Sequence, residues 1–215
     1  GAIYGGSMSG NTRIMDSSVT NNKAINDGGA SGLKASDVNV TDSYFKGNNA
    51  KNGGALYVGG TGKENKVLRS NFTDNHANGG YGGAIDWVAS SGDIFDSRFD
   101  ENTADYGGAL YLACNSSRSR ISKVVFEKNI AVFNGGAIDS NAAYVNLTHT
   151  RFISNVANYG AALCREANAT GGFGDNNTFI SNHARIGGAA LGWIEAVGIY
   201  INNYKFIDNT ADVYG

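Results

Sequence analysis

The sequence of 215 residues contains no proline and two cysteines, and its formal net charge at pH 7 is −2. Because a small negative net charge does not attract phosphates, the composition gives no reason to expect binding to nucleic acid or to an anionic membrane surface. No stretch approaches the ~20 consecutive apolar residues of a membrane-spanning helix, and no charged-then-apolar signal segment opens the chain. We therefore expect no membrane span in this segment.

The two cysteines, Cys114 and Cys164, lie in repeat units that are two units apart. If these units are coils stacked at ~4.8 Å, the two residues are separated by roughly 9.6 Å. This exceeds the ~7 Å Cα limit for a disulfide. We expect two free thiols, buried or half-buried in the fold.

The sequence contains 31 glycines, and those of the G-G-A segments recur at regular intervals. The unit is clearest in the stretch 99–112, FDENTADYGGALYL, which combines F-x-x-N-x-A with G-G-A-L. The first position of this motif recurs at intervals of 26, 27, 27, 27, 26, 27 and 27 residues, at Val19, Phe45, Phe72, Phe99, Phe126, Phe152, Phe179 and Phe206. A regular period of this length is typical of a solenoid.

Each unit contains three short segments of strand-like sequence separated by Ser, Asn and Gly, and none shows the 3.6-residue periodicity of a helix. The sequence therefore predicts a right-handed parallel β-helix, all-β, with about eight coils of ~27 residues and a length of roughly 38 Å. We expect one continuous β-helix over residues 1–215. Because the chain begins and ends inside a unit, we interpret it as a segment of a longer protein.

The repeated residues have a structural interpretation. Phenylalanine in successive coils predicts an internal aromatic stack. The Asn predicts a hydrogen-bonded ladder at a corner, in a position that tolerates left-handed backbone geometry. The glycine pair predicts a second corner with positive φ and close backbone approach.

A second period is superimposed on the first, because long and short units alternate. Most of the extra length lies after the G-G-A segment, around 59–62 (Gly-Gly-Thr-Gly) and 114–117 (Cys-Asn-Ser-Ser). We expect loops to protrude at this corner on every second coil, on a face that solenoids often use for binding. The residue two positions after the G-G-A alanine alternates as well, through Tyr4, Gly32, Tyr57, Asp86, Tyr111 and Asp139, before Cys164 and Leu191.

This row contains the best candidates for chemistry. Parallel β-helices also include enzymes that cleave polysaccharides, which need clustered carboxylates on adjacent coils. Asp86 and Asp139 are in register but two coils apart, roughly 9.6 Å, with Tyr111 between them. That separation slightly exceeds the ~6.5–9.5 Å of an inverting glycosidase pair. We expect both carboxylates to be solvated at a coil edge, and we expect no catalytic residue, no cofactor and no metal site.

The tyrosines of the same row, Tyr57 and Tyr111, are the candidate ligand-binding residues. Aromatic rings in register at ~9.6 Å could stack against sugars if they face outward. If they face inward they belong to the core. The sequence leaves both alternatives open.

The F-x-x-N-x-A and G-G-A-[I/L] units, such as 72–85 and 99–110, resemble the repeats of surface adhesins built on right-handed parallel β-helices. Two groups share this pattern: the adhesin-like proteins of methanogenic archaea and the polymorphic outer membrane proteins of chlamydiae. Scarce cysteine favours the archaeal group. The resemblance covers nearly the whole chain and is specific for architecture, since the matched residues belong to core and corners.

The resemblance implies a non-enzymatic adhesin or structural stalk at the cell surface. Its expected partners are glycans or proteins of another cell, and end-to-end self-association is a further expectation. The alternatives are a β-helical polysaccharide lyase or hydrolase and a self-assembling surface filament.

Overall fold

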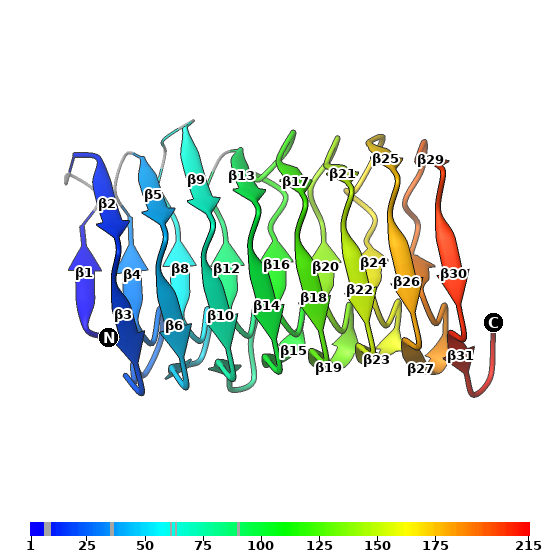
Figure 1. The fold of residues 1–215 in the computed structure, drawn as a ribbon, viewed down its shortest axis with the longest axis horizontal. Helices are drawn as coiled ribbons and strands as arrows, with labels where there is room; N and C mark the ends of the chain where they lie inside the picture. The colour runs from blue at the N-terminus through cyan, green and yellow to red at the C-terminus, as the bar shows by residue number, and fades with distance from the viewer. Residues whose placement is uncertain (7–9, 35–36, 61, 63, 90) are drawn as a thin grey trace.

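The chain folds as a right-handed parallel β-helix, as the sequence predicts (Figure 1). The computed structural model describes residues 1–6, 10–34, 37–60, 62, 64–89 and 91–215. In Figure 1 the strands nearer the viewer run downward and those behind run upward while the coil advances from left to right. Within the described ranges, no helix is long and apolar enough to cross a membrane.

Four parallel sheets run along the solenoid, and we name each by its place in the repeat. The GGA sheet follows the glycine corner and contains, in spatial order, β1 (Ile3–Gly5), β4 (Ser31–Leu33), β8 (Leu56–Val58), β12 (Ile85–Trp87), β16 (Leu110–Leu112), β20 (Ile138–Ser140), β24 (Leu163–Arg165) and β28 (Leu191–Trp193). The pre-Phe sheet contains β2 (Thr12–Met15), β5 (Val38–Thr41), β9 (Asn65–Leu68), β13 (Gly92–Phe95), β17 (Arg120–Ser122), β21 (Asn146–Thr148), β25 (Phe173–Asp175) and β29 (Tyr200–Asn202).

The other two sheets follow directly along each coil. The Phe sheet contains β3 (Ser18–Thr20), β6 (Tyr44–Lys46), β10 (Asn71–Thr73), β14 (Arg98–Asp100), β18 (Val125–Glu127), β22 (Arg151–Ile153), β26 (Thr178–Ile180) and β30 (Lys205–Ile207). The Asn–Ala sheet contains β7 (Asn49–Ala50), β11 (His76–Ala77), β15 (Thr103–Tyr106), β19 (Ile130–Asn134), β23 (Val156–Tyr159), β27 (His183–Gly187) and β31 (Thr210–Ala211).

The number of strands per coil differs from the prediction. The sequence predicts three strands, whereas a full coil has four, because the residues after the repeat Asn continue as an extended strand that buries its alanine. In the first coil this strand is reduced to a single bridge between Lys23 and Asn49. Three of the sheets have eight strands and the fourth has seven, so the solenoid makes about seven full turns, close to the predicted eight.

The phenylalanines form the internal stack that their spacing predicts. Ring centroids of successive residues from Phe45 to Phe179 lie 4.8, 4.8, 4.9, 5.2 and 4.8 Å apart, with interplanar angles between 3° and 15°. These separations match the 4.7–4.9 Å spacing of neighbouring strands. The six rings from Phe45 to Phe179 are fully buried, within a core cluster that extends from Ile14 to Ala190. Stacking in register thus sets both the period and the core.

The asparagines form the predicted ladder. The side-chain oxygen of Asn102 accepts from both the backbone N–H and the side-chain amide of Asn75, each at 3.0 Å. The Asn102 amide in turn donates to Asn129 Oδ1 at 2.9 Å and to the Phe72 carbonyl at 3.0 Å. Each buried amide is therefore satisfied by its copies in adjacent coils.

The left-handed corner lies one residue earlier than predicted. The positive φ belongs to the residue before the repeat Asn, such as Asp74 (55°) and Glu101 (56°). The Asn itself cannot take this role, because its side chain must point inward to bond with its copies. The glycine corner is as predicted: Gly107 has a φ of 62°, and a Cβ on Gly108 would lie 2.1 Å from the Gly136 carbonyl oxygen.

Connections from the GGA sheet to the pre-Phe sheet lie together at the top of Figure 1. In chain order they contain six, four, six, four, seven, five, seven and six residues, so the predicted alternation is confirmed for most of the chain. Part of the predicted 59–62 loop, Thr61, lies outside the described residues. The alignment of the last G-G-A unit differs from the prediction, which takes Ala189 as its alanine. An extra residue in β27 makes Ala190 the counterpart of Ala162.

The two cysteines are unpaired, but they differ in environment. Cys164 is buried, whereas Cys114 is exposed, so the prediction of burial is wrong for Cys114. The reason is that Cys114 lies in a protruding connection rather than on a strand.

We predict that Asn102→Ala destabilises the fold by about 3 kcal/mol or more, because the Asn75 N–H loses its partner and the Asn75 side-chain amide and the Phe72 carbonyl each lose a buried hydrogen bond. Urea unfolding measures this loss. Asn22→Ala is the matched control, because Asn22 is half-buried in the first coil and should cost clearly less. Equal losses for the two variants would contradict a role for the buried ladder.

Candidate functional site

The Tyr/Asp row lies on the outer face of the GGA sheet. Cross-strand pairing aligns Tyr57 with Asp86, Asp86 with Tyr111, and Tyr111 with Asp139, and the row continues to Cys164 and Gly192. On β8 the neighbours of Tyr57, Leu56 and Val58, are fully buried in the core. Since side chains alternate along a strand, Tyr57 faces outward. The predicted register is confirmed, except that Gly192 takes the place assigned to Leu191.

The two carboxyl groups of this row are buried, contrary to the prediction that they are solvated. Asp86 is 3% exposed and Asp139 is 0% exposed. Asp86 lies between Tyr57 and Tyr111, and the ring of Tyr81 packs on Tyr111 with centroids 4.5 Å apart. Bulky neighbours on the outer face thus shield positions that register alone places at a surface.

Burial changes the protonation of both groups. It raises the pKa of Asp86 to about 8, with a further contribution from the charge of Asp27. Burial and the neighbouring Glu166 also raise the pKa of Asp139 well above its usual value. One oxygen of Asp86 has no hydrogen-bond partner. A carboxyl group in such a site holds its proton and is poorly suited to act as a nucleophile or a base at neutral pH.

We predict a pH-dependent gain in stability for Asp86→Asn. Between pH 4 and about 8 the folded state holds a proton that the unfolded state has released, so the wild-type chain loses stability as the pH rises. The variant lacks this loss. It should therefore have a higher Tm than wild type at pH 9 and little advantage at pH 3. A difference of only two units between the folded and unfolded pKa values corresponds to about 2.7 kcal/mol.

The exposed Asp16 supplies the control for this experiment. Measured between pH 5 and 9, Asp16→Asn reports the effect of the same substitution at a carboxylate that is not buried. A constant Tm difference between Asp86→Asn and wild type over that range would contradict the protonated state.

The predicted ligand-binding residues, Tyr57 and Tyr111, do not form one platform. Both are half-buried, and Asp86 separates them along the row. Lys34 lies over the Tyr57 ring with its Nζ 5.8 Å from the centroid, and Tyr111 packs against Tyr81. Tyr57 also lines a hollow of about 490 Å³ near the first coils, with Tyr4, Lys34 and Asp27. Their role in binding stays a prediction.

A second aromatic row runs along the adjoining corner. Tyr81 stacks on Tyr106 with centroids 5.3 Å apart, and Tyr106 stacks on Phe133 at 5.1 Å. Tyr81 and Phe133 remain 40% and 42% exposed. The signal in the sequence is an aromatic residue one or two positions before the glycine pair, which our sequence reasoning did not use.

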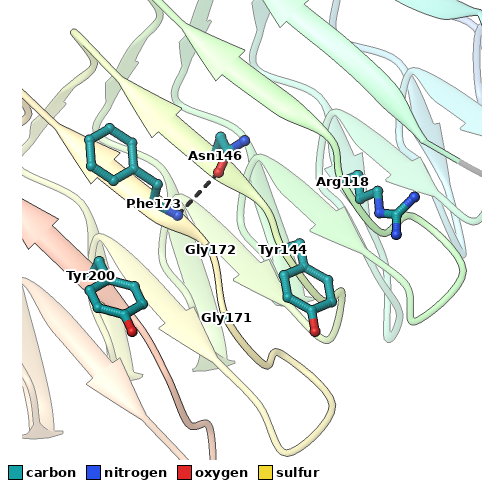
Figure 2. A pocket seen from close by; sticks show the side chains of 7 residues that line it. All are labelled: Arg118, Tyr144, Asn146, Gly171, Gly172, Phe173 and Tyr200. Atoms are coloured by element: carbon teal, nitrogen blue, oxygen red, sulfur yellow. Dashed lines mark hydrogen bonds between the residues drawn. The ribbon is translucent and has the colours of Figure 1, made fainter.

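An open aromatic site lies at the protruding corner and was also missed. This corner pocket has a volume of about 490 Å³ and is lined by Arg118, Tyr144, Asn146, Gly171, Gly172, Phe173 and Tyr200 (Figure 2). Tyr144, Phe173 and Tyr200 are 54%, 47% and 72% exposed. Figure 2 shows Tyr144 and Tyr200 on either side of the Gly171–Gly172 segment.

Successive coils contribute to the corner pocket through strand starts and loops. Asn146, Phe173 and Tyr200 begin β21, β25 and β29 and stand in register, and the Phe173 N–H donates to Asn146 Oδ1 at 3.1 Å. Register thus places an amide and two aromatic side chains in one row. This part of the site could have been read from the repeat.

The loop residues of the pocket are fixed by a close contact. A Cβ on Gly171, which has a φ of 62°, would lie 2.7 Å from atoms of the Tyr144 ring. Tyr144 itself adopts a φ of 56°. The ring therefore packs directly on the glycine backbone, and a side chain at Gly171 would displace it.

A buried arginine lies beneath the same loop. Arg165 is 5% exposed, and its Nη2 donates to the Gly171 carbonyl at 2.9 Å. A Cβ on Gly172 would lie 2.9 and 3.0 Å from the two terminal guanidinium nitrogens. Its Nε has no hydrogen-bond partner. Burial lowers the pKa of Arg165, and the nearby Tyr204 opposes this effect.

No group of three His, Cys, Asp or Glu side chains converges on a possible metal position in the part of the chain that the structure describes. The corner pocket presents aromatic rings, an amide and an arginine. Such groups can bind a ligand through apolar contact, hydrogen bonds and charge.

Comparison with known proteins adds three findings. Residues 42–59 match the Chlamydia polymorphic membrane protein (Chlamydia_PMP) repeat. The chain is 32% identical over 188 residues to the probable autotransporter YfaL of Escherichia coli (strain K12), covering 77% of this chain and 15% of that protein. It is 30% identical over 142 residues to the probable outer membrane protein PmpG of Chlamydia muridarum (strain MoPn / Nigg), covering 63% and 14%.

The chain thus spans about 15% of the length of these curated relatives. No solved structure matches the chain. The matches do not test the similarity to archaeal adhesin-like proteins. The resemblance to the chlamydial polymorphic membrane proteins, which the F-x-x-N and G-G-A motifs indicate, is confirmed by both the repeat model and a relative of that name.

Proposed function

We propose that the chain is a stretch of a cell-surface β-helix that binds glycans or other surface polymers of another cell without chemical turnover. The observation that carries the proposal is the corner pocket, which is lined by three exposed aromatic side chains, one from a loop and two from the first positions of strands in successive coils. Exposed aromatic clusters on a soluble surface are typical of interaction sites. Pyranose rings present apolar C–H faces that pack well on such side chains.

The relatives support the location. They are named as a probable autotransporter and a probable outer membrane protein, and this chain corresponds to a small part of each. A rigid solenoid of stacked coils suits exposure on a surface, because it extends binding loops along one edge. We therefore propose a cell-surface or outer-membrane setting for this chain.

The alternative of a polysaccharide-cleaving enzyme is disfavoured by the state of the row carboxyls. Asp86 and Asp139 are buried, their pKa values are raised, and Tyr111 lies between them. Acid–base cleavage needs one protonated and one ionised carboxyl on the two sides of a bond. We therefore propose that the chain binds glycans and does not cleave them.

We predict that the segment binds members of a glycan array and releases no reducing sugar from them. Tyr200→Ala should weaken binding about tenfold or more, equivalent to about 1.4 kcal/mol, because an exposed apolar contact face is removed. Tyr200→Phe keeps the ring and should retain most of the affinity. Loss of binding in Tyr57→Ala or Tyr111→Ala instead would move the site to the GGA sheet.

The reducing-sugar assay separates the proposal from its alternatives. Sugar release that disappears in Asp86→Asn or Asp139→Asn would establish the enzyme and refute the proposal. Absence of both binding and release would favour a structural stalk or a filament subunit.

A further inference from the structure

The charge among the residues that line the corner pocket has one sign. Arg118 is the one charged side chain among its lining residues in the described part of the chain. It is exposed, and no ion pair involving it occurs among the described residues. The neighbouring Arg120 differs, because its guanidinium is bound to Asp93 through two hydrogen bonds. A free cation therefore stands at the rim of the pocket.

A second cation lies directly behind the pocket floor. The Arg165 guanidinium is packed against Gly172 and bonded to the Gly171 carbonyl, and both glycines line the pocket. Within the described residues no carboxylate forms an ion pair with Arg165. Its Nε is buried without a partner. A buried charge without a partner is costly, because the protein supplies no opposite charge that compensates it. The Arg165 guanidinium is such a charge.

The floor between this arginine and the pocket is thin. Residues 171 and 172 carry no side chains, so only loop backbone separates the guanidinium from the cavity. In such a weakly screened setting a charge acts over several ångströms more strongly than it does in water. An anionic group on the glycine floor would face Arg165 from one side and Arg118 from the rim.

The walls of the pocket define the rest of the ligand. Tyr144, Phe173 and Tyr200 supply exposed aromatic surface, and the Asn146 side chain supplies an amide. An apolar ring face, hydroxyl groups and one negative charge together describe a sugar acid. From this arrangement we propose that the corner pocket binds a pyranose that carries a carboxylate, such as a uronic or sialic acid residue of a surface glycan.

This inference rests on the proposed function, since it names the chemical class of glycan that the same pocket takes. It goes further by assigning roles. The aromatic side chains bind the ring, Arg118 binds the carboxylate, and Arg165 acts through the loop as a positioning and electrostatic residue.

The test compares charged and neutral sugars of matched size by isothermal titration. Trigalacturonate is paired with galactotriose, and sialyllactose is paired with the neutral trisaccharide fucosyllactose, so that the two sources of a sugar carboxylate are distinguished. We expect at least one acidic probe to bind tenfold or more tightly than its neutral partner. Raising the salt concentration should reduce this preference, because charge–charge attraction is screened.

Variants locate the preference in the pocket. Arg118→Gln should reduce the preference for the acidic probe several-fold, whereas Arg120→Gln, outside the pocket lining, should leave it unchanged. Arg165→Met keeps an apolar side chain of similar length in the core and should also reduce the preference. Thermal melting of each variant verifies that the fold is retained, and Arg118 carries the test alone if Arg165→Met does not fold.

The remaining outcomes overturn the inference in different ways. Equal affinity for acidic and neutral probes, lost in Tyr200→Ala, would refute the acidic sugar and leave the proposed function intact. An acidic preference that Arg118→Gln and Arg165→Met both retain would refute the assignment to this pocket. Failure of every acidic and neutral sugar to bind would refute the inference and the glycan-binding function together.

Discussion

Every feature of this molecule depends on the stacking of each coil on the next in a fixed register. Successive strands lie about 4.8 Å apart, so a residue at one position of the repeat meets its own copy above and below. Phenylalanine becomes a continuous ring stack, and asparagine becomes a continuous amide ladder. A side chain that cannot serve its copies would interrupt both, which explains why these positions are so uniform in the sequence.

The same constraint determines where function can reside. Inward positions are committed to the core, so variation is confined to the outer rows and to the connections. The outer row of the GGA sheet alternates aromatic and carboxyl side chains and shields the latter from water. At the protruding corner, Phe173 and Tyr200 stand in register and meet loop residues such as Tyr144. A binding site on this fold is therefore assembled from several coils.

Much of the fold could be predicted because a short-range pattern, repeated with constant spacing, fixes long-range pairing. The exceptions are instructive. The fourth strand was missed because a segment such as Thr103–Tyr106 buries one small residue, Ala104, and so lacks the large apolar residue that marks the other strands. One departure from the repeat is compensated by another. Gly174 stands in register with Leu147 but has no side chain, and the Tyr204 hydroxyl occupies the place where its Cβ would point.

The site was less accessible to sequence reasoning. Register placed Tyr57, Asp86, Tyr111 and Asp139 in one row, but it does not report what covers a row, so the burial of the two carboxyls was unexpected. The corner pocket depends on Tyr144 packing against Gly171 and on Arg165 lying behind Gly172. Each of these contacts involves a residue of an irregular loop, and such residues have no period to reveal them.

The central claim is that ligand binding belongs to the corner pocket and not to the row on the GGA sheet. Amide chemical-shift mapping by NMR during titration with an acidic oligosaccharide tests it most directly. The account predicts perturbed amides at Asn146, Gly171, Gly172 and Phe173, with those of Tyr57, Asp86 and Tyr111 unchanged. Perturbations confined to the GGA sheet would contradict it.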